Sequence, residues 1–330
     1  MVKVLFSTLD QEYSEITPYG SGEYKRILRY FNNDVVKKYQ KTEDPEEAEI
    51  ILFIQLLTPD YKRVRKHSYV KRYLEKCFVW HSGDKVFPYL PGLYTSLEKP
   101  FHIKGWSKSS YYLSVACNDS IRYLGPIPDD AYLFSFFGRK NTHKVRREIF
   151  KLQDPGGFIV NSIDNSQSGL YLQDYLNSIK KSKFVLCPRG FGSSSFRLFE
   201  ALKCGRVPVI ISDNWVPPDD IPWDEISIRV SEKDVNLIPE ILKAKEHIVH
   251  TMSEKGYAIW TEKFDLYHGF NTIIDWCVQI KKERIIDPKI MKSFIFLLKL
   301  KPFFISGLIK RKIIKPIHKL LPAGKTGLIL

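Results

Sequence analysis

The 330-residue sequence contains few cysteines, and those it has form no recognisable pattern. The five cysteines are odd in number and widely spaced, and no two of them form a C-x-x-C pair. This spacing argues against a zinc site and against a disulfide framework, and it favours a reducing compartment. The chain also lacks internal repeats and low-complexity tracts. Because 44% of its residues are hydrophobic, wholesale disorder is excluded, and the length suits two domains of ordinary size.

The sequence also has no D-x-D tripeptide, although closely spaced carboxylates are the usual protein ligands of a catalytic divalent cation. Its adjacent aspartates, at 129–130 and 219–220, lie in proline-rich connections. We therefore expect no metal site. The first residues, MVKVLFSTLD, lead directly into a strand pattern, without a charged region followed by an apolar signal core. Together with the cysteines, this start predicts a cytoplasmic protein.

The most informative stretch is residues 183–209, KFVLCPRGFGSSSFRLFEALKCGRVPV. An apolar run of strand type is followed by a turn rich in glycine and serine, an amphipathic helix and a second strand. Residues 193–195 supply N-cap chemistry for a helix over 196–203, and Gly205 ends that helix. A helix start of this kind presents unpaired N–H groups and a partial positive charge, which together favour a phosphate.

Two arginines in this stretch strengthen the prediction of a phosphate site. Arg189 lies in the turn and Arg197 in the first turn of the helix, so both can donate paired hydrogen bonds to a diphosphate. Glu200 follows Arg197 by three residues on the same helical face, where a carboxylate suits a ribose diol or a sugar hydroxyl. Taken alone, Arg197 and Glu200 would be interpreted as an ordinary surface pair. Their place beside this turn favours the functional interpretation.

Strands and helices alternate along the chain, a pattern typical of parallel sheets. Strands are expected over 2–6, 50–54, 77–80, 132–137, 184–187, 207–211 and 226–230. Helices are expected over 23–39, 60–74, 143–152, 170–181 and 195–203, and again from residue 235 onward. The proline-rich and acidic segment at 125–131 is the predicted linker. The pattern therefore predicts an α/β protein with one domain over 1–125, a second over 126–285 and a tail over 286–330.

The segment CPRGFGSSSFRLFEALKCGRVPVIISDNW, residues 187–215, resembles the signature of the exostosin family of glycosyltransferases. Members of that family carry a C-P-R-G turn, an S-x-R step and an E-A-L-x-x-G-x-x-P-V-I unit from helix to strand. Two further segments are similar to family motifs: DPEEAEIILFIQ at 44–55 and YLFSFFGRKNTHKVRREIF at 132–150, the latter with its downstream arginines. The resemblance extends over residues 1–270.

This resemblance implies two Rossmann-like domains that face each other across a cleft, the GT-B architecture. It implies a donor site for a nucleotide-sugar, usually UDP-linked, in the second domain and an acceptor site in the first, with inverting transfer of a hexose or pentose. The acceptor would be a glycan or a lipid-linked glycan in surface polysaccharide synthesis. The nucleotide-sugar is a co-substrate, so no cofactor is expected. The sequence departs from the plant members around residues 80–84, where VWHSGD (79–84) stands in place of an R-D-H segment.

Ligands of open parallel sheets gather beyond the carboxyl ends of the strands, and this rule adds candidates. Arg139 follows the predicted strand at 132–137 and is a second candidate for the donor phosphate, although a solvated loop explains it equally well. Asp213 and Asn214 follow the strand at 207–211 and suit the base or sugar end of a donor, although turn formation also explains them. The predicted donor-binding residues are Arg139, Arg189, Gly190, Ser194, Ser195, Arg197, Glu200, Asp213 and Asn214.

Inverting transfer needs a base near the acceptor hydroxyl and a positive environment for the departing diphosphate. The base should come from a strand end of the first domain. Asp84, in the H-S-G-D turn, is the first candidate, followed by His81 and Asp10. Asp84 could instead close a turn with Gly83. Because arginines and a helix start can stabilise the diphosphate, we expect a metal-independent enzyme.

The positive charge of the chain is concentrated at its end. Residues 281–330 contain 13 Lys and Arg against 2 acidic residues, which gives +11 of the total net charge of +14. The longest uncharged run there, residues 302–309, is far shorter than the roughly 18 residues needed to span a bilayer. A basic, apolar helical tail over 286–330 suits an anionic membrane surface, at the inner face of the cell membrane, although it could instead pack on the protein body.

Two other functions fit parts of the sequence. A nucleic-acid-binding protein would use the same basic tail, but the arginine-bearing turn belongs to a folded α/β domain, so no nucleic acid is expected. A non-catalytic sugar-binding or assembly subunit would keep the donor site without turnover.

Overall fold

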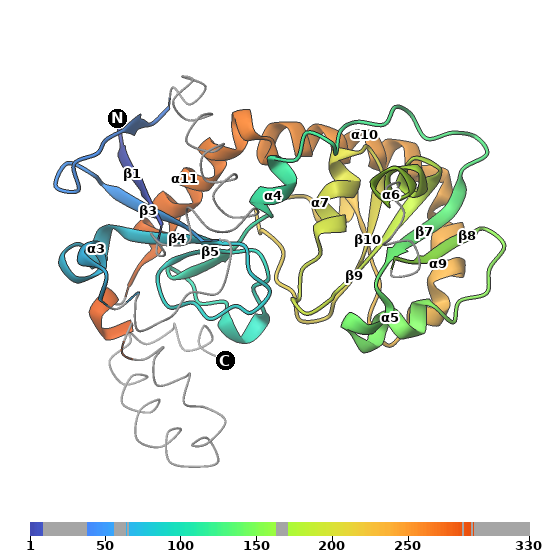
Figure 1. Cartoon of the computed structure of the whole chain (residues 1–330), viewed down its shortest axis with the longest axis horizontal. Helices are drawn as coiled ribbons and strands as arrows, with labels where there is room; N and C mark the ends of the chain where they lie inside the picture. Colours follow the sequence, from blue (N-terminus) through green and yellow to red (C-terminus); the bar gives the residue numbers. More distant parts are fainter. Residues whose placement is uncertain are drawn as a thin grey trace, which may run out of the picture.

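The computed structural model describes residues 1–8, 38–55, 64, 66–162, 171–285, 287–291 and 293. Within them, the strands form two separate β-sheets, and helices pack around both (Figure 1). Every strand pair in the two sheets is parallel. The predictions of an α/β protein and of parallel sheets are therefore confirmed.

The first sheet has the strand order β2-β1-β3-β4-β5-β6. Its central strands are buried along their whole length, because continuous apolar runs such as IILFI and CFVW suit a sheet that is covered on both faces. The strands are Lys3–Ser7 (β1), Gln40–Lys41 (β2), Ile50–Gln55 (β3), Cys77–His81 (β4), Gly92–Tyr94 (β5) and Ser107–Ser109 (β6).

The second sheet has the order β11-β10-β9-β7-β8. The chain builds outward from β7 in one direction to β8 and in the other to β9, so the topological switch point lies between β7 and β9. In open α/β sheets the ligand site lies beyond the carboxyl ends of the strands at this point. The strands are Tyr132–Gly138 (β7), Gly157–Asn161 (β8), Ser182–Pro188 (β9), Val207–Ile211 (β10) and Ile228–Arg229 (β11).

The helices of the described residues are mostly short, and α7 follows the predicted phosphate-binding turn. It runs over Phe196–Lys203 and ends as expected, because Gly205 adopts a φ of 69° just beyond its C-cap residue. The other α-helices are Ser68–Arg72 (α3), Leu113–Ala116 (α4), Lys144–Ile149 (α5), Tyr171–Lys180 (α6), Trp223–Ile226 (α8), Ile238–Lys245 (α9), Val249–Ile259 (α10) and Leu266–Glu283 (α11). Short 3₁₀ segments lie at Leu74–Lys76, Lys99–Phe101, Lys140–Thr142, Val235–Leu237 and Glu246–Ile248, and a π-helical turn at Trp260–Phe264 joins α10 to α11.

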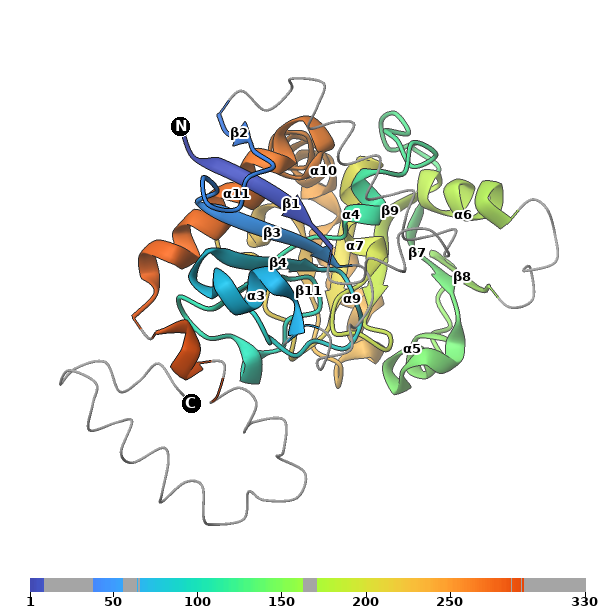
Figure 2. The same ribbon diagram turned by 60° about the vertical axis from the view of Figure 1, so that its left-hand side comes forward.

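Helix α11 returns from the second sheet to the first, along which it runs in both ribbon views (Figures 1 and 2). Phe270 of α11 packs edge-on against Phe6 of β1, with 6.2 Å between ring centroids. Asp275 of α11 accepts hydrogen bonds from Lys38 Nζ, at 2.7 Å, and from the Tyr39 hydroxyl. The last helix within the range 126–285 therefore covers the first sheet.

Two loops, residues 95–99 and 214–216, join the two sheets by backbone hydrogen bonds. The Lys99 N–H donates to the Asn214 carbonyl at 3.0 Å, and the Val216 N–H donates to the Leu97 carbonyl at 2.9 Å. The indole of the buried Trp215 donates to the Thr95 carbonyl at 2.9 Å. Because one loop follows β5 and the other follows β10, these bonds hold the carboxyl ends of the two sheets together.

The structure corrects several boundaries. The strand expected over 226–230 is reduced to Ile228–Arg229, because Trp223–Ile226 is helical. The helix expected over 143–152 covers only Lys144–Ile149. The sequence analysis missed β2, β5, β6 and β8, whose short, polar or glycine-containing sequences carry a weak strand pattern.

Some expectations fall on parts of the chain without a description. Most of the helix expected over 23–39 lies there, as does most of the tail over 286–330. The helix expected over 60–74 is described in its larger part, and there it is shorter than expected, covering Ser68–Arg72. In the described part of the chain, no helix is both long and apolar enough to cross a membrane.

Candidate functional site

The turn predicted to bind phosphate, residues 189–195, joins β9 to α7 at the switch point of the second sheet. The Gly190 N–H donates to the Gly192 carbonyl at 3.2 Å, and the Arg189 N–H donates to the Ile211 carbonyl at 3.0 Å. The Ser193 hydroxyl donates to the Ser96 carbonyl of the first domain at 2.8 Å. These bonds fix the turn on both sides, so the start of α7 is presented in a defined position beside the first domain.

The N-cap chemistry expected of the serines is wrong in detail. Ser195 occupies the N-cap position with extended backbone, but its side chain makes no capping hydrogen bond. The Ser195 hydroxyl is buried, and no described residue is its hydrogen-bond partner. Ser194 is buried beside the Tyr112 phenol. A buried hydroxyl without a partner is costly, so its presence at a helix start points to a ligand.

Arg146 of α5 lies directly under this turn. Its side chain is 7% exposed and donates from Nε to the Arg189 carbonyl at 2.9 Å and from Nη2 to the Pro188 carbonyl at 3.2 Å. Burial, followed by repulsion from Arg197, lowers the pKa of the Arg146 guanidinium to about 9. A Cβ atom added to Gly190 would lie 3.0 Å from Arg146 Nη2, so the turn packs closely on this guanidinium.

Arg197 of α7 supplies the second positive charge. Its Nε donates to the Phe137 carbonyl at 2.8 Å, and its guanidinium lies 5.2 Å from the centroid of the Phe136 ring. The Arg146 guanidinium lies 5.7 Å from the same centroid. Among the described residues, neither arginine forms an ion pair with a carboxylate. Two neighbouring cations without a paired anion form a site that favours a diphosphate.

Glu200, one helical turn after Arg197, accepts a hydrogen bond from the Tyr175 hydroxyl through Oε2. Burial raises the pKa of the Glu200 carboxyl, and the hydrogen bond from Tyr175 opposes that shift. Glu200 and Arg197 do not form the surface ion pair that their spacing allows; each instead contacts Tyr175. Within the described residues Oε1 has no hydrogen bond, so it is available to a ribose or sugar hydroxyl.

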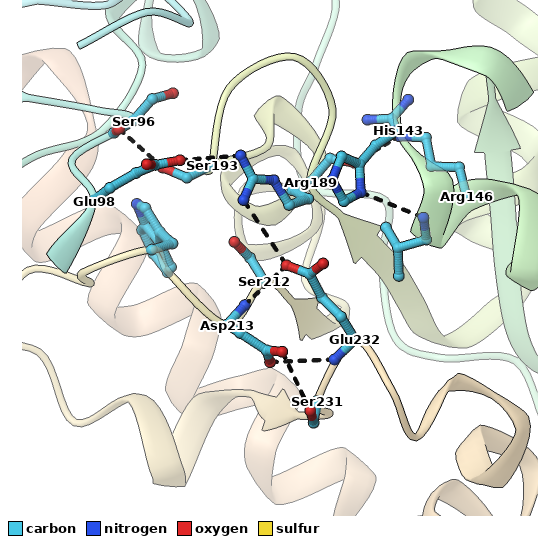
Figure 3. A network of polar contacts seen from close by, with 12 residues as sticks. Ser96, Glu98, His143, Arg146, Arg189, Ser193, Ser212, Asp213, Ser231 and Glu232 are labelled. Atoms are coloured by element: carbon cyan, nitrogen blue, oxygen red, sulfur yellow. Dashed lines mark hydrogen bonds and ion pairs between the residues drawn. The ribbon is translucent and has the colours of Figure 1, made fainter. Parts of the chain in front are cut away.

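Arg189, a predicted phosphate ligand, is placed between two carboxylates (Figure 3). Its Nη2 lies 3.0 Å from Glu98 Oε1 of the first domain, and its Nη1 lies 3.9 Å from Glu232 Oε1. The two carboxylates therefore balance the charge of Arg189, and its ion pair with Glu98 links the two domains. Arg139, the other predicted phosphate ligand, has an exposed side chain, and its carbonyl accepts a hydrogen bond from Arg146 Nη1 at 3.4 Å.

Asp213 and Asn214 also serve the loops at this edge. The Asp213 carboxylate accepts hydrogen bonds from the Ser231 hydroxyl at 3.3 Å and the Glu232 N–H at 3.2 Å (Figure 3). Asn214 contributes its carbonyl to the interdomain bond with Lys99. The structure thus gives both residues loop contacts, in agreement with the turn interpretation left open from sequence.

On the first domain, Asp84 faces the turn. A Cβ atom added to Gly192 would lie 2.7 Å from Asp84 Oδ1, which shows how closely the carboxylate and the turn approach. Although Asp84 remains accessible to solvent, partial burial raises the pKa of its carboxyl, while Arg146 and the Gly192 N–H exert smaller opposing effects. The structure therefore brings together a carboxylate of elevated pKa and the arginine pair.

His81 ends β4, three residues before Asp84, and is 1% exposed. Burial lowers the pKa of its imidazole to about 4, and neither ring nitrogen has a hydrogen-bond partner among the described residues. His81 is therefore a neutral buried group behind Asp84. Asp10, the third candidate base, lies outside the described residues. In the same described part of the chain, no group of three or more His, Cys, Asp or Glu side chains is arranged to hold a metal ion.

Two residues of this region, Arg146 and Glu98, were not singled out from sequence. Arg146 belongs to the segment 132–150, where the arginines after the Y-L-F-S-F-x-G pattern were the available signal. Glu98 carries no sequence signal, because its role depends on contact with a residue 91 positions away.

The chain is similar to proteins of one known family. Residues 120–245, which include the arginine pair and the turn, match the family described as Exostosin GT47 domain. An "Exostosin-1 homolog" of Caenorhabditis elegans is 44% identical over 275 residues, which cover 66% of this chain and 70% of that protein. A "Probable glycosyltransferase" of Arabidopsis thaliana is 34% identical over 292 residues, with 71% of this chain covered. "Exostosin-1" of Drosophila melanogaster is 24% identical over 187 residues, with 50% of this chain covered.

The chain spans 60% of the Arabidopsis protein and 24% of the Drosophila protein. The match to the nematode protein covers more than two thirds of that protein. The motifs read from the sequence, the two parallel sheets and these similarities lead to one conclusion: this chain belongs to the exostosin family of glycosyltransferases.

Proposed function

We propose that this protein transfers a sugar, with inversion, from a nucleoside diphosphate sugar to a hydroxyl of a glycan or lipid-linked glycan. The donor is UDP-linked, and the product belongs to a surface polysaccharide. One observation carries the proposal: Arg146 and Arg197 meet at the switch point of the second sheet without a paired carboxylate among the described residues. A diphosphate has the charge and the oxygen geometry to satisfy both guanidinium groups at once.

In this proposal the diphosphate lies between the arginine pair and the amides at the start of α7. The unpartnered Ser195 hydroxyl donates to it, since a phosphate oxygen is a strong acceptor. The nucleoside lies farther along α7, where Glu200 Oε1 accepts from a ribose hydroxyl. Arg189 remains paired with Glu98 and Glu232 and holds the domains rather than the ligand.

The chemical step is a single displacement. Asp84 accepts the proton of the acceptor hydroxyl as that oxygen forms a bond to the anomeric carbon and the bond to the diphosphate oxygen breaks. The negative charge that develops on the leaving diphosphate is stabilised by the arginine pair, whose two positive charges repel each other. Because these cations are part of the chain, the reaction is proposed to be independent of metal ions.

The proposed setting is the inner face of an anionic membrane, reached through the basic residues 286–330. Lipid-linked acceptors would be concentrated there, and the lysine-rich composition of the tail supports the proposal. Cosedimentation of the full chain with vesicles containing phosphatidylglycerol, compared with a chain ending at Ile290, tests it. Equal cosedimentation of the two chains would rule out a role for the tail.

Calorimetric titration with UDP tests the donor site. Arg197→Ala is expected to weaken UDP binding by about 1.5 to 3 kcal/mol, because a charge-assisted hydrogen bond is lost. Arg146→Lys keeps the charge but loses the fixed geometry of the guanidinium, so it should also weaken binding. Arg147→Ala is the matched control, since Arg147 is the next residue of the same helix and is exposed.

Equal UDP affinity in all four proteins would contradict the proposed site. Turnover of a panel of UDP-sugars, followed as UDP release with and without excess EDTA, then tests the reaction and its independence of metal. UDP binding without turnover on any donor and acceptor would favour a non-catalytic sugar-binding subunit.

A further inference from the structure

The turn between β9 and α7 carries a large aromatic side chain that neither the core nor the proposed donor site uses. Phe191 is 71% exposed, the highest value for an aromatic residue in the part of the chain that the structure describes. The serines that follow it in the same turn are buried. Phe196, at the other end of the turn, is 44% exposed and stacks on Tyr112 of the first domain, with 4.0 Å between ring centroids. One accessible aromatic ring therefore lies within this short turn, and a second follows it at the start of α7.

The backbone that carries Phe191 is fixed rather than free. Gly190 and Gly192, on either side, are joined by a hydrogen bond of 3.2 Å. Gly190 packs against Arg146, and Gly192 packs against Asp84 and Ser96 of the first domain. A ring on a fixed backbone loses little further conformational entropy when a ligand stacks on it.

The two glycines also define where along the reaction path Phe191 lies. Gly190 touches the arginine proposed to bind the diphosphate, and Gly192 touches the carboxylate proposed to act as base. Phe191 is therefore placed at the junction between leaving group and acceptor. The nucleoside end of the donor lies in the other direction, along α7 toward Glu200 and Tyr175.

We propose that Phe191 binds the acceptor: its ring stacks on the apolar C–H face of a pyranose, the terminal sugar of a glycan chain, and orients one hydroxyl of that sugar toward Asp84. The inference rests on the proposed function and adds the chemical class of the acceptor. A pyranose suits this position because it combines an apolar face for an aromatic ring with hydroxyls at its edge. A small alcohol or water has no such face, so it gains nothing from Phe191.

Two reactions of the same UDP-sugar distinguish a pyranose acceptor from water. One is transfer to a methyl glycoside, and the other is hydrolysis, in which water is the acceptor. In the full-length protein, Phe191→Ala should raise the KM for the methyl glycoside roughly three- to tenfold, the range that aromatic stacking supports. The rate of hydrolysis and the UDP affinity should stay at wild-type values. Phe191→Tyr keeps the ring and should restore the KM. Tyr267→Ala removes an exposed ring of α11 and is the control.

An unchanged KM for the glycoside in Phe191→Ala would overturn the inference. A loss confined to UDP affinity would also overturn it, because it would assign the ring to the nucleobase. Neither result touches the arginine pair, whose test is the UDP affinity of Arg197→Ala. Failure of the wild-type protein to bind UDP would instead reject the proposed function, and this inference with it.

Discussion

The two ends of helix α7 each lie near a buried arginine, and the two arginines differ in one respect. Arg206, beyond the C-terminus of the helix, is fully buried and donates to the carbonyls of Gly125, Gly205 and Lys180 at 2.9, 2.7 and 3.0 Å. Arg146, near the N-terminus, is almost as buried and also donates to loop carbonyls. Burial is the main cause of a lowered pKa in both, but only Arg146 is lowered further by a neighbouring cation, Arg197.

The serine hydroxyls near the two ends of α7 also differ, in whether they have hydrogen-bond partners. Ser253, at the C-terminal end, donates to the Gly205 carbonyl at 2.8 Å. At the N-terminal end, Ser195 and Ser212 are buried and have no hydrogen-bond partner among the described residues. The guanidinium groups themselves do not make this difference, since Arg206 Nε is also buried without a partner among the described residues. A buried guanidinium group alone therefore does not mark a site, whereas a second cation and unpartnered hydroxyls beside it favour an anionic ligand.

The largest expected effect is at Asp84, the carboxylate closest to the N-terminal end of α7. Asp84→Asn should lower kcat by about 10²- to 10⁴-fold, because the acceptor proton loses its base. UDP affinity should not fall, since the substitution removes a negative charge from beside Arg146. Asp130→Asn, in an exposed part of the linker, is the control. Initial rates of UDP release with a glycoside acceptor, together with UDP calorimetry, provide both measurements.

The pH dependence of the reaction tests the same carboxylate. The base must be ionised, and burial raises the pKa of Asp84. Activity should therefore be present above that raised pKa and be lost as the pH falls through it, at a higher pH than an unperturbed aspartate would give. A profile of kcat/KM whose acidic limb lies at the pKa of a free aspartate would contradict this assignment.

Arg206 offers the contrasting experiment at the other end of the helix. Arg206→Ala should lower the free energy of unfolding by about 3 to 5 kcal/mol, because several buried carbonyls lose their donors together. The UDP affinity of the folded fraction should remain unchanged. Urea denaturation and calorimetry should therefore give opposite results for the two variants. Arg206→Ala should lose stability and keep its UDP affinity, whereas Arg197→Ala should lose UDP affinity and keep most of its stability. Loss of UDP affinity in folded Arg206→Ala would erase the distinction.

How much of this could be predicted from the sequence depends on the range of the interactions. Local patterns predicted the strand, turn and helix around residues 183–209, including the stop at Gly205. They failed for β6, Ser107–Ser109, because a short polar strand owes its place to its neighbour in the sheet rather than to its own residues.

The candidate site shows the same limit. Arg189 and Arg197 looked equivalent in sequence, since both lie beside the turn. In the structure, residues far away in the chain separate them: Glu98 and Glu232 neutralise Arg189, while Arg146 adds charge beside Arg197. No local pattern encodes these partners, so the choice between a ligand-binding and an ion-paired arginine required the fold.

The smallest expected effect concerns that choice. Glu98→Gln should remove the interdomain ion pair with Arg189 and lower the free energy of unfolding by about 0.5 to 1.5 kcal/mol, since both side chains are partly shielded from solvent. Glu225→Gln breaks an exposed ion pair with Lys255 inside the second domain and should change stability less. If Arg189 only joins the domains, UDP affinity in Glu98→Gln stays within twofold of wild type. Tighter UDP binding would instead mean that a released Arg189 reaches the diphosphate, and the three arginines would then form one binding set.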